Sequence, residues 1–99
     1  MKESVFQASL IRRIKDTFSG CIVLKNDANY IQGFPDLLIL YGDKWAALEC
    51  KAGEKSSLRP NQLYYLETLS DLGFAAMIYP EVEDLVMDQL ERYLGGMNV

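Results

Sequence analysis

The segment of residues 35–51 places the strongest constraint on how this chain folds. It contains two apolar runs, and the dipeptide Gly42-Asp43 separates them. Glycine tolerates the positive φ that a tight hairpin turn requires, so this pattern predicts a β-hairpin centred on the dipeptide. The chain is therefore expected to contain at least one antiparallel strand pair.

The expected register of this hairpin brings two acidic side chains together. Counting outward from a symmetric turn, the apolar pairs are Leu40 with Trp45, Ile39 with Ala46 and Leu37 with Leu48. The next pair is Asp36 opposite Glu49, and directly opposed Cβ atoms lie about 4.5–5.5 Å apart. Opposed like charges are unfavourable, and a divalent cation between the carboxylates would remove the conflict. Lys51 lies two residues beyond Glu49, so it projects to the same face.

Length and composition predict one globular domain spanning residues 1–99. The chain has 99 residues, and 49% of them are hydrophobic. No apolar run approaches the ~18 residues of a membrane span, so no membrane partner is expected. The first residues lack the apolar core of a secretion signal. We therefore expect a cytoplasmic protein.

The cysteine and histidine content limits the possible metals. Cys21 and Cys50 are the two cysteines, and there is no histidine. Two isolated thiols do not supply the Cys/His tetrahedron of a zinc site, so zinc is not expected. Both cysteines are expected in strands as buried free thiols. A metal in this protein would be bound by oxygen, which favours magnesium, manganese or calcium.

Charge is distributed unevenly along the chain. The net charge is −4, but residues 1–59 carry nine Lys or Arg and seven Asp or Glu, whereas residues 60–99 carry one and seven. The face around the hairpin is thus expected to be locally basic on an acidic protein. The acidic second part is equally well explained as a solvated helix.

Hydrophobic periodicity predicts helices and strands in a fixed order. Helices are expected at residues 3–18, 60–72 and 83–94, with Gly73 ending the second, and strands at residues 21–24, 37–40, 46–51 and 74–79. The strand at 37–40 is apolar on both faces, so we expect it to be covered on both sides. A helix between the third and fourth strands allows a parallel return. The predicted fold is a small α/β sandwich with a mixed sheet.

The acidic residues and Lys51 also match known sequence motifs. Asp36, followed by Glu49-Cys50-Lys51 on the adjacent strand, resembles the motif of the PD-(D/E)XK nucleases. Gly33-Phe34-Pro35-Asp36 resembles the Gly-x-Pro-Asp motif of the VRR-NUC family, the virus-type replication-repair nucleases. Glu3 with Gln7 resembles the N-terminal acidic motif of that family, and Pro60-Asn61-Gln62 resembles the start of its crossover helix. The resemblance runs from Glu3 to about Tyr79.

This resemblance implies a fold and a set of residue roles. The fold would be a nuclease-like core of α-β-β-β-α-β order with a C-terminal helix. Asp36, Glu49 and the backbone carbonyl of Cys50 would ligate Mg²⁺ or Mn²⁺, and Glu3 would complete the site directly or through a water. Lys51 would orient or help deprotonate the attacking water. Gln62 would hydrogen-bond Lys51 or the scissile phosphate.

The resemblance also implies an activity and partners. It implies metal-dependent hydrolysis of DNA phosphodiester bonds by a structure-selective endonuclease, acting on branched DNA such as Holliday junctions in replication, recombination or repair. Stand-alone members of the family look like phage proteins, which implies that the cell is a bacterium or a phage-infected host. A two-fold symmetric homodimer would place two sites on opposed strands. A backbone binder needs cations near its site. The candidates for phosphate contacts are Lys25, Lys55, Arg59, Arg12 and Arg13.

Ordinary structural roles remain open for each residue taken alone. Asp36 suits a turn, Glu49 and Lys51 suit a surface strand pair, and Gln62 suits a first helical turn. Glu3 compensates the dipole of its helix without any metal. Two other functions are therefore open: a DNA-binding or scaffold module that kept the fold without catalysis, and a protein-interaction module whose acidic C-terminal helix contacts a basic partner.

Overall fold

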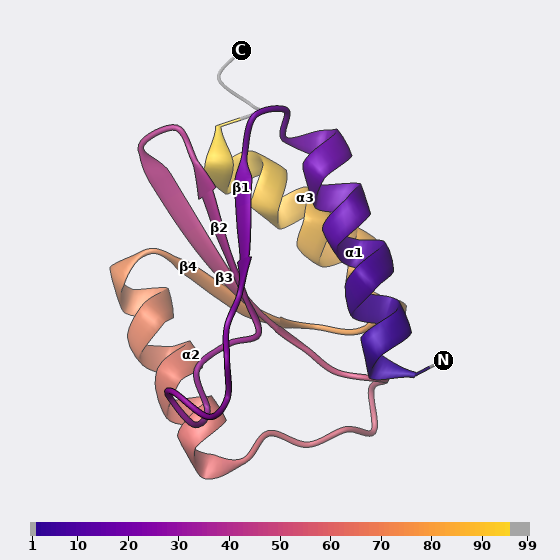
Figure 1. Cartoon of the computed structure of the whole chain (residues 1–99), viewed down its shortest axis with the longest axis vertical. Helices are drawn as coiled ribbons and strands as arrows, with labels where there is room; N and C mark the ends of the chain where they lie inside the picture. Colours follow the sequence, from indigo (N-terminus) through magenta and orange to yellow (C-terminus); the bar gives the residue numbers. More distant parts are fainter. Residues whose placement is uncertain (1, 96–99) are drawn as a thin grey trace.

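The computed structural model describes residues 2–95, which form a four-stranded mixed sheet with helices on both faces (Figure 1). In chain order the elements are α1 (Glu3–Thr17), β1 (Ile22–Lys25), β2 (Leu37–Tyr41), β3 (Lys44–Cys50), α2 (Pro60–Leu72), β4 (Phe74–Ile78), the 3-10 turn η1 (Pro80–Val82) and α3 (Glu83–Leu94). The expected α/β fold with a mixed sheet is confirmed. None of the helices in residues 2–95 combines the length and the apolar character needed to cross a membrane.

The hairpin of β2 and β3 has the register that the sequence predicts. Leu40 pairs with Trp45, Ile39 with Ala46 and Leu37 with Leu48. Gly42 has a φ of +62°, and no residue other than glycine has a positive φ among residues 2–95. This is the pattern of a type II′ turn, in which glycine occupies the first central position.

The outer strands extend the sheet on either side of this hairpin. β1 pairs antiparallel with β2, and β4 pairs parallel with β3, so the strand order is β1-β2-β3-β4. A parallel neighbour requires a long connection, and α2 supplies it. β1 begins at Ile22, one residue later than expected, and Cys21 lies just before it. Both cysteines are free thiols, as expected; Cys50 is buried, but Cys21 is only half-buried, so the expectation of burial is wrong for Cys21.

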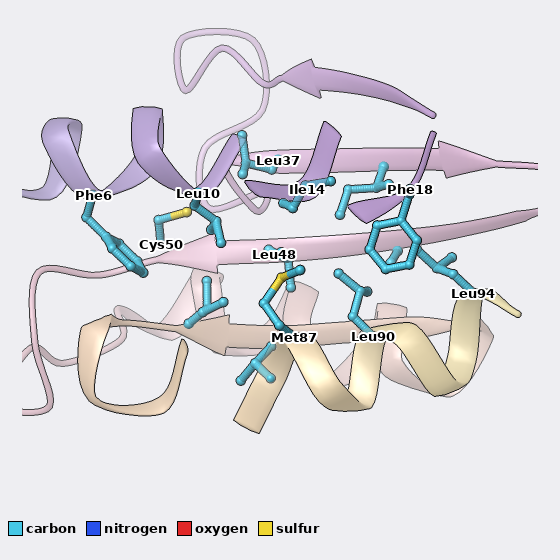
Figure 2. Close-up of a cluster of buried hydrophobic side chains, with 14 residues drawn as sticks. Phe6, Leu10, Ile14, Phe18, Leu37, Leu48, Cys50, Met87, Leu90 and Leu94 are labelled. Atoms are coloured by element: carbon cyan, nitrogen blue, oxygen red, sulfur yellow. The ribbon is translucent and has the colours of Figure 1, made fainter. Parts of the chain in front are cut away.

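The core lies between the sheet and the pair of helices α1 and α3. Apolar residues recur at every fourth position of α1, so one stripe of that helix faces the sheet. α1 ends at Thr17, one residue earlier than expected, yet the next residue, Phe18, stays buried. Figure 2 shows the resulting cluster, which includes Phe6, Leu10, Ile14, Phe18, Leu37, Leu48, Cys50, Met87, Leu90 and Leu94.

The other face of the sheet is only partly covered. α2 packs against β4 and β3 and does not extend over β1. Leu40 is 37% exposed, and Ile22 and Leu24 on β1 are 55% and 43% exposed. The expectation that residues 37–40 are covered on both sides is therefore wrong at Leu40. One crossover helix is too narrow to shield four strands, so the half of the face formed by β1 and β2 stays open.

Candidate active site

The two acids singled out in the sequence lie together at one end of the sheet. Asp36 immediately precedes β2, and Glu49 is the next-to-last residue of β3. The hairpin register, extended by one pair, sets them opposite each other. Both side chains line one cavity of about 270 Å³ on the α2 side of the sheet. The sheet geometry thus produces the opposed carboxylates that the sequence predicts.

The backbone of β3 holds the Asp36 carboxylate. Asp36 Oδ2 accepts a hydrogen bond of 2.8 Å from the backbone N–H of Cys50. Burial raises the pKa of Asp36, and the Cys50 hydrogen bond and the charges of Lys51 and Lys25 oppose that rise. The Asp36 side chain is therefore fixed in position beside the last residues of β3.

Glu49 is a carboxylate in a nearly dry environment. It is 3% exposed, and it is the one charged residue buried in the part of the chain that the structure describes. Its Oε2 accepts a hydrogen bond of 3.0 Å from Gln62 Nε2 and lies 3.5 Å from Lys51 Nζ. Its Oε1 is buried without a hydrogen-bond partner in residues 2–95. Burial, and then the charge of Asp36, raise the pKa of Glu49 to about 7.

Gln62 links the first turn of α2 to Glu49 in β3 and to Lys51 just after the end of that strand. Its Oε1 accepts hydrogen bonds from Lys51 Nζ at 3.0 Å and from the backbone N–H of Arg59 at 2.9 Å. Two donors on Oε1 fix the orientation of the amide, so Nε2 must face Glu49. The resemblance implies Lys51 or the scissile phosphate as the partner of Gln62, and the structure contains the hydrogen bond from Lys51. The side chain of Lys51 is 12% exposed, so its ammonium is held close to Glu49.

The side chain of Cys50 points away from this site, as its place in the strand predicts. It belongs to the buried cluster on the α1 and α3 face, near Phe6 and Leu10 (Figure 2). Burial raises the pKa of the Cys50 thiol to about 12, so it stays protonated at neutral pH. Only the backbone of Cys50 belongs to the candidate site.

The remaining candidates divide into residues near the cavity and residues away from it. Arg59 lines the cavity, and the charge of Lys25 acts on Asp36. Glu3 is exposed at the start of α1, where its charge contributes to the raised pKa of Glu49, but it does not line the cavity. Lys55 is exposed in the connection between β3 and α2.

The two arginines of α1 lie on the opposite side of the sheet from the cavity. Arg13 Nη1 donates to Glu83 Oε2 at 2.7 Å and to Asp84 Oδ1 at 2.8 Å. These ion pairs tie α1 to the start of α3 and raise the pKa of Arg13. Arg12 is exposed on the same helix. The geometry therefore gives Arg13 a structural role and brings neither arginine to the candidate site.

Three carboxamide residues of the cavity have no role that the sequence predicts. Asn29 and Gln32 come from the loop between β1 and β2, and Asn61 comes from the first turn of α2. The signal available was the concentration of Asn and Gln in residues 26–32 and 61–62. Only the fold shows that these two stretches meet, because Gly33 (φ +87°) packs so closely that an added Cβ would lie 2.6 Å from Asn61 Cγ.

The candidate metal ligands are the carboxylates of Asp36 and Glu49 and the backbone carbonyl of Cys50. Within residues 2–95, no three side chains of His, Cys, Asp or Glu gather closely enough to form a metal cluster by themselves. The unpaired Glu49 Oε1 beside Asp36 is the feature that fits an oxygen-binding cation. No protein-family model matches the chain, and no curated protein matches it.

Proposed function

We propose that this protein is a Mg²⁺- or Mn²⁺-dependent nuclease that hydrolyses DNA phosphodiester bonds. The observation that carries the proposal is the buried, unpaired Oε1 of Glu49, a residue that lines a cavity together with Asp36. A buried carboxylate oxygen without a partner is costly, and native proteins retain such groups where they serve a function. A hard divalent cation satisfies that oxygen and offsets the repulsion between the two acids.

The oxygen ligands suit magnesium or manganese. Asp36 and Glu49 would hold the ion together with the backbone carbonyl of Cys50. When bound, such an ion lowers the pKa of a coordinated water and neutralises charge on the phosphate. With no histidine in the chain, proton transfer falls to Lys51 and to water.

Lys51 and Gln62 would act together beside the acids. Lys51 Nζ is 3.0 Å from Gln62 Oε1 and 3.5 Å from Glu49 Oε2, so the ammonium is already directed into the site. In that position it would orient the attacking water and stabilise negative charge on the phosphate. Gln62 is a positioning residue in this account, because it holds Lys51 and Glu49 at a fixed separation.

The proposed substrate is branched DNA, cut by a structure-selective endonuclease in replication, recombination or repair. The proposal includes a homodimer, because two-fold symmetry presents two sites to opposed strands. It is supported by Arg59 in the cavity and Lys25 near Asp36, which supply cations beside the site. Contacts between these cations and phosphates predict DNA binding that weakens as the salt concentration rises.

The direct test is cleavage of a panel of single-stranded, nicked, flapped and four-way-junction DNA with Mg²⁺ and with Mn²⁺. Asp36→Asn, Glu49→Gln and Lys51→Ala are each expected to reduce the rate by at least about a hundredfold, because each removes a group that acts on the reacting phosphate. The matched controls are Glu67→Gln and Lys15→Ala, which change exposed residues on α2 and α1. Unchanged cleavage in any of the three variants would remove that residue from the mechanism. Binding without cleavage by the wild-type protein would favour the non-catalytic DNA-binding module.

A further inference from the structure

Carboxamides are the commonest side chains around the cavity beside Asp36 and Glu49. Four of its residues, Asn29, Gln32, Asn61 and Gln62, carry side-chain amides, and Arg59 is its one cationic residue. Surfaces that track a nucleic-acid backbone are instead rich in lysine and arginine. The lining therefore suits a ligand group with neutral hydrogen-bond donors and acceptors.

Three of these amides are free to recognise a ligand. Gln62 is engaged by Lys51, Arg59 and Glu49. The side chains of Asn29, Gln32 and Asn61 form no hydrogen bond with another residue of the range 2–95, and all three residues are exposed. A carboxamide offers both an acceptor and a donor, and it pairs with the edge of a nucleobase in a bidentate way.

The walls of the cavity are held in place before any ligand arrives. The loop between β1 and β2 is fixed by bonds from Asn26 to the backbone carbonyls of Asp36 and Pro35, at 2.8 Å and 2.6 Å. Gly33 packs against Asn61, and the ring of Phe34 contacts Tyr65 edge-on with centroids 5.4 Å apart. Figure 1 shows this loop beside the first turn of α2. A preformed site binds without the cost of ordering its loop.

We infer that this cavity binds one unpaired nucleobase of the DNA strand that is cut. Its volume of about 270 Å³ lies near the ~300 Å³ lower limit of small-molecule sites. A base in a duplex has its pairing edge occupied, whereas an unpaired base can turn that edge toward the carboxamides and its ring toward Phe34. Tyr30, 86% exposed beside Asn29, offers a second surface on which a neighbouring base can stack.

This inference rests on the proposed function and specifies its substrate: a strand with an unpaired nucleotide next to the scissile phosphate. The first experiment does not depend on cleavage. Deoxycytidine and deoxyadenosine, which carry no phosphate, are titrated to millimolar concentration while the side-chain amide NMR signals are followed. The signals of Asn29, Gln32 and Asn61 are expected to shift. The signal of Gln89, exposed on α3, is expected to stay in place. Unmoved cavity signals, or an equal shift at Gln89, would overturn the inference.

The second experiment measures the preference between substrates. The ratio of kcat/KM for a duplex with a single-stranded flap to that for a blunt duplex is compared between the wild-type protein, Gln32→Ala and Gln89→Ala. Gln32→Ala is expected to lower the ratio about tenfold, the size of one lost bidentate contact to a base, and Gln89→Ala to leave it unchanged. An unchanged ratio in Gln32→Ala refutes the base site and leaves the nuclease proposal standing. Absence of all cleavage refutes the nuclease proposal, and the nucleoside titration then decides the base site alone.

Discussion

At the scale of single residues, Glu49 is the side chain least suited to its surroundings. It is buried, it faces a second acid, and one of its oxygens has no partner within residues 2–95. Gln62 and Lys51 satisfy the other oxygen. One oxygen of a residue that lines the cavity is thus left without a partner. The proposed metal site follows from that oxygen.

The raised pKa of Glu49 predicts how stability depends on pH in the absence of metal. The carboxyl has a pKa of 4.5 when unperturbed and about 7 in the folded protein. Between these values the folded state holds a proton that the unfolded state has lost. The free energy of unfolding should therefore fall as pH rises from about 4.5 to 7, by about 3 kcal/mol from this group. Glu49→Gln removes the titrating carboxyl and should flatten this dependence.

Urea unfolding in EDTA at pH 5 and at pH 8 measures the effect. Wild type should lose more stability between the two values than Glu49→Gln does, and Glu67→Gln should behave like wild type. Parallel pH profiles for wild type and Glu49→Gln would mean that Glu49 is not protonated in the folded state.

Residue identity and spacing were enough to predict the acid pair but not its environment. The turn at Gly42-Asp43 fixes the register, and the register sets Asp36 against Glu49. The local sequence predicts neither the burial of Glu49 nor the place of Asn61 in the cavity lining, because both depend on how residues 26–36 fold against α2. Contacts between distant segments are set by packing, which periodicity does not encode.

At the scale of elements, the junction between α2 and β4 depends on Gly73. The sequence predicts Gly73 as the end of α2, and the helix does end at Leu72. The φ of Gly73 is −168°, an extended value that any residue adopts, so its conformation does not require glycine. Its surroundings do, because a Cβ at this position would lie 2.7 Å from Trp45 Cζ2. Trp45 on β3 thus fixes how closely the end of α2 approaches the sheet.

Gly73→Ala is expected to destabilise the protein by about 1–3 kcal/mol, since the indole of Trp45 must move to accept the methyl group. Gly53→Ala is the matched control, because the nearest atom to its added Cβ is a carboxylate oxygen of Glu81 at 3.8 Å. Denaturant unfolding monitored by Trp45 fluorescence measures both. Equal free energies of unfolding for the two variants would show that the indole of Trp45 moves aside without any loss of stability.

At this scale, the sequence predicts the helix boundaries but not how much of each strand is covered. The helices begin and end within a residue or so of the expected positions, because their apolar stripes are regular. The sequence does not predict the exposure of Leu40. Apolar residues on both faces of a strand do not show how far a neighbouring helix extends over it.

At the scale of the whole molecule, on the α2 side of the sheet, the half of the face formed by β1 and β2 is left uncovered by any helix of residues 2–95. β1 lies at the edge of the sheet, and Ile22, Leu24 and Leu40 are exposed on the same face. An edge strand with apolar neighbours is prone to pair with another chain. Antiparallel pairing of β1 with β1 of a second copy would continue the sheet across a two-fold axis and set Ile22 and Leu24 beside their counterparts on the same face.

The proposed homodimer is tested by light scattering at micromolar concentration. Wild type should give twice the 11.2 kDa mass of one chain. Leu24→Lys places a charge on the open face and should return the mass to one chain. Leu85→Lys, at an apolar residue 58% exposed on α3, should remain dimeric. A mass of one chain for the wild-type protein would contradict the dimer.

The central claim is that the acids at the end of β2 and β3 bind a divalent cation, and calorimetric titration with Mn²⁺ at pH 7.5 tests it most directly. The account predicts saturable binding by the wild-type protein, loss of that binding in Asp36→Asn and in Glu49→Gln, and unchanged binding in the exposed control Glu67→Gln. Absence of Mn²⁺ binding by the wild-type protein, or equal binding by Glu49→Gln, would contradict it.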